Sequence, residues 1–251
     1  NSGSTPLHGA AEEGHIDTVN TLIANGAKVN AQDDHGRTAL HYATKKGHIN
    51  IVNTLITNGA NVNEKTNHGK TALYKAALKG HIDTVHTLIA NGANVNENTD
   101  KGWTSLHAAA EKGHIDTVNT LIANGANVNE KNDDGYTPLH SAANKGHIDT
   151  VNTLIANGAN VNEKGNNGRT AVHWAAIKGH IDTVKILESC MKRVEKQRIE
   201  KEKRRIMLRR EEKKFHQRRR NMALQRANRE KAEKEETEKV ETEKEETEKE
   251  E

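Results

Sequence analysis

Histidine offers the most obvious chemistry in this sequence. The chain of 251 residues contains 15 histidines, and a neutral imidazole is both a common metal ligand and a proton acceptor near neutral pH. Most of them fall in two series whose members lie 33 residues apart, and no HExxH, CxxC or clustered Cys and His pattern is present. We therefore expect the histidines to serve the fold, and we predict no metal site and no cofactor.

A catalytic nucleophile has little support. Cys190 is the single cysteine, which excludes an internal disulfide, and no accompanying His and Asn pattern supports a catalytic thiol. The sequence has no GxSxG, no GxxxxGK[ST] and no dinucleotide fingerprint, because its glycines end helical patterns and do not follow strands. We predict that the protein is not an enzyme.

Three segments of different charge make up the chain. Residues 1–191 carry a net charge of −2, residues 192–229 of +12 and residues 230–251 of −7. Only 33% of the residues are hydrophobic and 2% aromatic, which is too little for one large core in a chain of this length. We expect a folded domain, a basic helical extension and an acidic low-complexity tail over residues 1–190, 191–229 and 230–251.

A repeat of 33 residues dominates the first segment. The motif Thr-x-Leu-His, with small variations, begins at six threonines: Thr5, Thr38, Thr71, Thr104, Thr137 and Thr170. A second motif, GHIDTV or GHINIV, follows each of them, and a third, NGA-x-VN, follows in the first five units. Such a period predicts an array of stacked structural units.

Each unit is interpreted as two short helices and a connector. In the fifth unit, Thr137 suits an N-cap, Pro138 a first helical residue and Gly146 a helix end. A second helix follows with one apolar stripe: Ile148, Val151, Leu154 and Ile155. Residues 159–168 are rich in Asn and Gly and predict turns. Helices this short are marginal alone, so we expect units to stack through small alanines and a continuous row of leucines.

The consensus G-x-T-P-L-H-x-A-A-x-x-G followed by V-x-x-L-I-x-N-G-A-x-V-N resembles the ankyrin repeat family over about residues 1–190. The resemblance implies an all-α solenoid of antiparallel helix pairs with projecting finger loops, whose concave face binds another protein. It also implies a structural hydrogen-bonding role for the TPLH-type histidines: His8, His41, His107, His140 and His173. The chain departs from the pattern at Tyr74, which replaces this histidine, at Thr44, which replaces an alanine, and in its incomplete first and last units.

Positions that vary between units are the candidates for recognition. Two such positions, one before the capping threonine and one after the TPLH motif, hold four of the aromatic residues. Aromatic and arginine side chains are the usual anchors of protein interfaces. The predicted partner-binding set is Arg37, Tyr42, Lys70, Lys75, Trp103, Tyr136, Arg169 and Trp174. The alternative is that Trp103 or Trp174 packs against a neighbouring finger and that the charges are merely solvated.

The charged tail has no Gly or Pro after Gly179, and its residues are mostly good helix formers. We expect it to be helical or disordered, and we disfavour a coiled coil because Lys201 interrupts the heptad series. The density of Lys and Arg in 192–229 is compatible with binding to nucleic acid, an acidic protein or anionic lipid, or with nuclear import. A solvated helix fits equally well.

The leading hypothesis is a monomeric, non-catalytic interaction module or scaffold that binds a partner protein on its concave surface. The alternative is a nucleic-acid-associated factor in which residues 192–229 bind phosphate while the repeats recruit a partner. No apolar run in the sequence is long enough for a membrane span, and we expect the protein in the cytoplasm or the nucleus.

Overall fold

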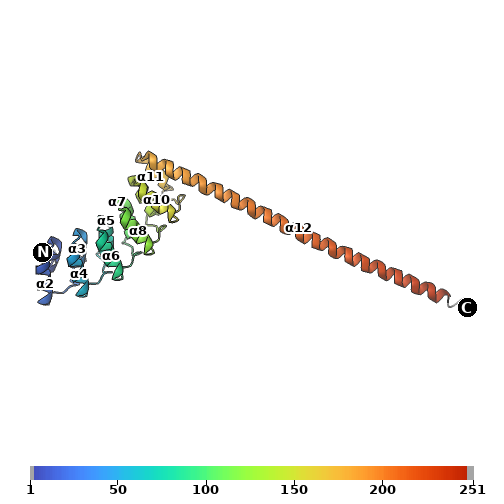
Figure 1. The fold of residues 1–251 in the computed structure, drawn as a ribbon, viewed down its shortest axis with the longest axis horizontal. Coiled ribbons are helices and arrows are strands. Elements are labelled where there is room, and N and C mark those ends of the chain that lie inside the picture. The colour runs from blue at the N-terminus through green and yellow to red at the C-terminus, as the bar shows by residue number, and fades with distance from the viewer. Residues whose placement is uncertain (1–2, 248–251) are drawn as a thin grey trace. The chain divides into compact units, whose positions relative to one another are not determined.

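Helices form all the regular secondary structure of residues 3–247, which are the residues that the computed structural model describes. They are α1 (Pro6–Glu13), α2 (Ile16–Ala24), α3 (Ala39–Lys46), α4 (Ile49–Thr57), α5 (Ala72–Lys79), α6 (Ile82–Ala90), α7 (Ser105–Lys112), α8 (Ile115–Ala123), α9 (Pro138–Lys145), α10 (Ile148–Ala156), α11 (Ala171–Ile177) and α12 (Ile181–Thr247). The chain divides into two compact units, Asn1–Met191 and Lys192–Glu251. The predicted all-α solenoid is confirmed, and Figure 1 shows the helix pairs following one another in chain order.

The first helix of each pair starts at a threonine. In α1, α3, α7, α9 and α11 a capping box joins this threonine to the histidine at the third helical position. The box satisfies two backbone N–H groups that a helix start otherwise leaves free. Helix α5 has Tyr74 at this position, so only the bond from Tyr74 N to Thr71 Oγ1 remains, at 3.2 Å.

The second helix of the fifth pair, α10, buries a narrower stripe than its sequence predicts. In α10, Val151 and Leu154 are fully buried and Ile155 is half-buried, as expected, but Ile148 is 38% exposed. Ile148 opens the helix and therefore lies at the edge of the packed face. Thr150 is buried in its place, as are the threonines at the same position of other units: Thr84, Thr117 and Thr183. The expectation for Ile148 was wrong.

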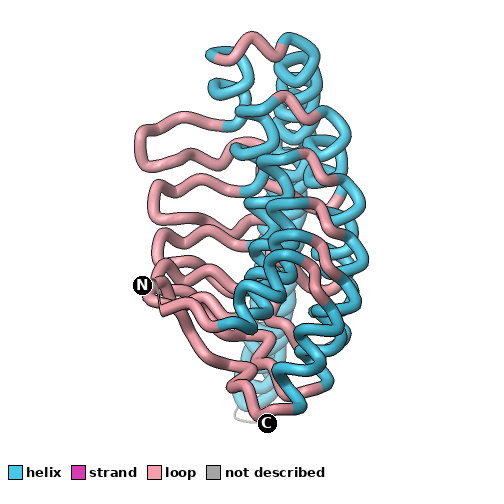
Figure 2. Tube along the Cα trace, turned by 90° about the vertical axis from the view of Figure 1, so that its left-hand side faces the viewer, coloured by secondary structure: helices cyan, strands magenta, loops and turns pink. Residues whose placement is uncertain are grey.

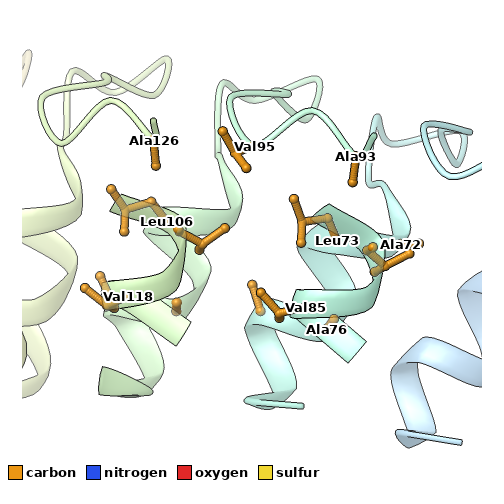
Figure 3. Close-up of a cluster of buried hydrophobic side chains, with 14 of the residues drawn as sticks. Ala72, Leu73, Ala76, Val85, Ala93, Val95, Leu106, Val118 and Ala126 are labelled. Atoms are coloured by element: carbon orange, nitrogen blue, oxygen red, sulfur yellow. The ribbon is translucent and has the colours of Figure 1, made fainter. Parts of the chain in front are cut away.

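One core of small and branched side chains runs through the unit Asn1–Met191. Helix α7 packs against both α5 and α9. Figure 3 shows Leu73 and Val85 of one helix pair and Leu106 and Val118 of the next as parts of a single buried cluster. The alanines and leucines predicted to permit this stacking are fully buried: Ala109, Ala110, Ala142, Ala143, Leu121, Leu154 and Leu187.

Loops project from the helices on one side and form the fingers (Figure 2). An asparagine ties each finger region to the next, since Asn30 Nδ2 donates to Gly59 O and Asn30 Oδ1 accepts from Asn61 N, both at 2.8 Å. We call this pair of bonds the amide bridge. It recurs with nearly the same distances at Asn63, Asn96 and Asn129.

The unit that begins at Lys192 consists of helix through Thr247. Every side chain from Lys192 to Thr237 is exposed, including the apolar residues of the heptad series: Val194, Leu208, Phe215 and Met222. A helical charged tail, one of the two predicted forms, is thus confirmed over the described residues. None of the described helices has an apolar stretch that could cross a membrane.

Candidate partner-binding surface

The two histidine series have structural partners. Nδ1 of His41 accepts a hydrogen bond from Thr38 N at 3.1 Å, and its Nε2 donates to Lys70 O of the next finger at 3.1 Å. Burial is the main reason why the pKa values of His41 and His107 fall from 6.5 to about 4. The histidines predicted to be structural all make the bond to their threonine: His8, His41, His107, His140 and His173.

Histidines of the second series bind the unit before them. Nε2 of His48 lies 3.1 Å from Glu12 O, and Nε2 of His147 lies 3.0 Å from Glu111 O. Within the described part of the chain, no group of three His, Cys, Asp or Glu side chains is placed to hold a metal ion. These imidazoles therefore act as links between units.

The predicted partner-binding residues lie where the finger bases meet the first helices of the units. We call the area formed by these eight residues and their lining neighbours the recognition surface. Arg37 and Tyr42 meet at its N-terminal part, where the Arg37 guanidinium lies 4.9 Å from the centroid of the Tyr42 ring. Both side chains bond to the same carboxylate oxygen of buried Asp33, at 2.7 Å from Arg37 Nε and 2.8 Å from Tyr42 Oη.

Asp33 anchors this part of the finger, and the prediction had missed it. Burial alone would raise its pKa, but hydrogen bonds from Arg37 N, His35 N and the two side chains lower it to about 2. Burial and the bond to Asp33 raise the pKa of Tyr42 to about 12. A signal was available in the sequence, because the same position of the next three units is polar and caps the finger backbone: Thr66, Thr99 and Asn132.

Positive charge gathers on the neighbouring part of the surface. Lys75 is partly buried on α5 and forms no ion pair with the described residues. Burial lowers its pKa, and repulsion from Lys70 and Lys45 lowers it further. Lys70 lies beside the Tyr74 ring, with Nζ 5.7 Å from the ring centroid.

A broad depression of about 590 Å³ lies next to these lysines, between the third and fourth units. Its lining includes Lys70, Tyr74, Trp103 and Glu111. Burial and the negative charge of Glu111 raise the pKa of Tyr74. The depression thus combines two ring systems with charges of both signs.

A smaller cleft of about 180 Å³ lies on the C-terminal side of Trp103, and we call it the aromatic cleft. Its lining residues are Trp103, Asp134, Tyr136, His140, Ser141, Asn144 and Trp174. The rings of Tyr136 and Trp174 meet edge to face, with centroids 5.6 Å apart. The Arg169 guanidinium lies 5.2 Å from the Trp174 ring centroid and is not among the lining residues.

The eight predicted residues have different surroundings. Trp103 is half-buried and borders both depressions. Tyr136, in contrast, does contact the next finger, since Asn167 Nδ2 donates to its hydroxyl at 2.7 Å and a Cβ at Gly165 would clash with its ring. Whether the eight side chains bind a partner stays a prediction.

Comparison with known proteins identifies the repeated unit. The family model described as "Ankyrin repeats (3 copies)" matches residues 1–66, 58–132 and 106–198, which together cover most of the chain. The chain belongs to the ankyrin repeat family. Among solved structures, the crystal structure of the human ASB11 ankyrin repeat domain is similar to this ankyrin repeat protein, with a TM-score of 0.69 and 31% sequence identity over 74% of this chain and 84% of that chain.

No curated protein sequence matches the chain. Ankyrin repeats are generally protein-protein interaction modules and are typically non-catalytic.

Proposed function

We propose that this ankyrin repeat protein is a monomeric, non-catalytic module that binds a protein partner on the recognition surface. The observation that carries the proposal is the position of Trp103, which stands between two depressions and lines both of them. Tryptophan, tyrosine and arginine supply most of the binding energy in protein interfaces, usually from sheltered central positions. Trp103 has Lys70 and Tyr74 on one side and Tyr136 and Trp174 on the other.

The test compares two double variants of the full chain in affinity capture from cell extract, with the captured proteins quantified by mass spectrometry. Trp103→Ala with Trp174→Ala removes two rings from the recognition surface. His86→Ala with Asn119→Ala is the matched control, because both residues are exposed on second helices, α6 and α8. We expect the first variant to lose about tenfold or more of a specific partner and the control to retain it.

Equal capture by the two variants would contradict the proposal. Circular dichroism and thermal unfolding of each variant show whether it remains folded. A variant with Lys70→Ala alone repeats the test with less risk to the fold, since Lys70 is partly exposed and lines the broad depression.

A second candidate function, binding of nucleic acid by residues 192–229, is favoured by one observation. This segment has 17 Lys and Arg against 5 Glu, and all of its side chains are exposed along the helix. Arg198 and Arg205 pair with glutamates one turn earlier, but even complete pairing of all five glutamates would leave a large excess of cations. Such a helix suits contact with the phosphates of nucleic acid. Because this candidate function needs access to nucleic acid, we propose that the protein is located in the nucleus as well as in the cytoplasm.

Salt dependence tests this second candidate. Fluorescence anisotropy with labelled duplex DNA should give a log–log slope of about −0.9 for each phosphate that a cation neutralises. Replacement of Arg218, Arg219 and Arg220 by Gln should reduce the slope by about two to three. If the full chain binds DNA without a salt dependence, or if the triple variant keeps the slope, the candidate is wrong.

A further inference from the structure

The aromatic cleft has the dimensions of a site for one side chain. Its volume of about 180 Å³ is smaller than the roughly 300–1,000 Å³ of pockets that hold whole small molecules. Rings from three consecutive units form its walls: Trp103, Tyr136 and Trp174. A long side chain that enters it would therefore be surrounded by aromatic carbon.

Two acceptors among the polar groups of the cleft have no partner in the described residues. Asp134 is exposed, and its carboxylate forms no ion pair or hydrogen bond with the described residues. Asn144 Oδ1 is buried and also has no hydrogen-bond partner in the described part of the chain. Asp134 is therefore the acceptor that an occupant of the cleft can reach, since Asn144 Oδ1 is closed off from solvent.

The formal charge of the lining is negative. Asp134 contributes one negative charge, and no Lys or Arg belongs to the described lining residues. Burial lowers the pKa of His140, which favours its neutral form. The Arg169 guanidinium lies against Trp174, so this ring system already accepts a guanidinium group.

We propose that the aromatic cleft binds a lysine or arginine side chain of the protein partner. The ring faces carry negative partial charge and attract a cation that approaches within about 6 Å, while the alkyl stem of such a side chain packs against apolar surface. Asp134 neutralises the charge and accepts hydrogen bonds at the mouth of the cleft. This inference rests on the proposed protein-binding function and specifies the chemistry of one contact.

Tryptophan fluorescence of the full chain tests the inference directly. The chain has two tryptophans, and both line the cleft; Trp103 also lines the broad depression, whereas Trp174 does not, so a response of Trp174 reports the cleft. The probes are N-acetyl-lysinamide and N-acetyl-argininamide, with N-acetyl-norleucinamide as the uncharged probe of similar length. We expect the cationic probes to bind about tenfold more tightly than the norleucine probe at low ionic strength.

Two single variants separate charge from shape. Asp134→Asn should abolish most of the preference for cations while leaving the walls unchanged. Asp133→Asn removes the same charge from the neighbouring exposed residue, which does not line the cleft, and should keep the preference. Trp103→Leu should weaken binding of all three probes, with Trp174 as the remaining reporter.

Equal affinity for the norleucine and cationic probes would overturn the inference and indicate an apolar occupant. An unchanged preference in Asp134→Asn would overturn it as well. The cationic probe that binds with the higher affinity shows whether the cleft prefers a lysine or an arginine side chain. Partner capture, described above, is independent of these titrations. If only the cation preference fails, the protein-binding proposal is still supported. If only capture fails, the cation preference of the cleft is still supported.

Discussion

At the scale of single residues, buried histidines make this protein sensitive to mild acid. His41 and His107 are almost fully buried, and their pKa values are about 4 in the folded chain against 6.5 when unfolded. The unfolded chain binds more protons between these values, so stability falls as pH falls. Their stabilisation is complete above pH 6.5 and is lost progressively toward pH 4.

Urea unfolding between pH 7 and 4 checks this prediction. We expect the free energy of unfolding to decrease by up to about 3 kcal/mol for each of the two histidines by pH 4. NMR titration of the histidine Cε1 protons assigns the change to individual residues. A free energy that stays constant over this range would contradict the structural role of the histidines.

Asp33 is a second residue whose loss should be costly. Asp33→Asn removes the charge that holds the Arg37 and Tyr42 side chains, and we expect the variant to be less stable by about 1–3 kcal/mol at pH 7. Because the folded pKa of Asp33 is about 2, the difference should be full above pH 4 and shrink as pH falls toward 2.

Chemical denaturation of Asp33→Asn and Asp34→Asn at pH 7 measures this effect. Asp34 is the matched control, because it is exposed and its carboxylate has no hydrogen-bond partner among the described residues. Equal stability of the two variants would show that the contacts of Asp33 are not important.

At the scale of elements, the glycine that ends each first helix also makes room for the next unit. Gly80 has φ 72°, and a Cβ there would lie 2.6 Å from Nδ1 of His114. Gly92 has φ 84° with no atom within 4 Å of such a Cβ. Both glycines have a left-handed backbone, so a side chain at either position causes backbone strain. Only a side chain at Gly80 would also clash with a neighbouring residue.

Gly92→Ala and Gly80→Ala therefore form a matched pair. We expect Gly92→Ala to destabilise by about 1–2 kcal/mol, the cost of left-handed backbone for a residue with a Cβ. Gly80→Ala should cost about 1–2 kcal/mol more, because the His114 ring must move away from its partner, the backbone of Leu78. Thermal unfolding of the two variants gives the difference, and equal midpoints would refute the packing argument.

Elements that repeat could be predicted from the sequence, and contacts that differ between units could not. The caps, the glycine ends and the leucine row recur six times, so periodicity exposes them. Tyr74 and Gly165 occur once each, and their meaning depends on neighbouring units. Helix α5 lacks a capping box because Tyr74 replaces the histidine, and the Tyr74 ring lines the broad depression. Gly165 has no side chain and so leaves space for the Tyr136 ring. The expected burial of Ile148 was wrong because helical periodicity does not show where the end of a helix extends beyond its packing partners.

Candidate site residues could be predicted because they vary where the rest of the repeat stays constant. Variation between units identified the positions of Trp103, Tyr136 and Trp174, which the structure places around one cleft. It did not identify Asp134, because its importance comes from a carboxylate without a partner among the described residues of the cleft, which only the three-dimensional arrangement reveals.

At the scale of the whole molecule, stability depends on coupling between adjacent units. Arrays of this type are stabilised by the units and by their nearest-neighbour interfaces. Asn96 forms an amide bridge to the following unit, whereas Asn162 occupies the same position of the fifth connector and its side chain has no such bridge in the described residues. We expect Asn96→Ala to destabilise by about 1–2 kcal/mol and Asn162→Ala to be nearly neutral.

Denaturant titration followed by circular dichroism and by tryptophan fluorescence measures both effects. In Asn96→Ala the two signals should separate, because Trp103 lies at the weakened interface and Trp174 on its C-terminal side, whereas circular dichroism reports all the helices. Coincident curves with unchanged midpoints would show that the bridge does not couple the units.

The amide bridges also set how the repeat array would respond to a pulling force. Four bridges of nearly equal length, 2.8–3.0 Å, follow one another from Asn30 to Asn160. Tension applied along the fingers passes through each of them in turn, and all of them are exposed and differ in length by no more than 0.2 Å. The array therefore behaves as a series of equal links, which should extend under load in uniform steps rather than break at one weak joint.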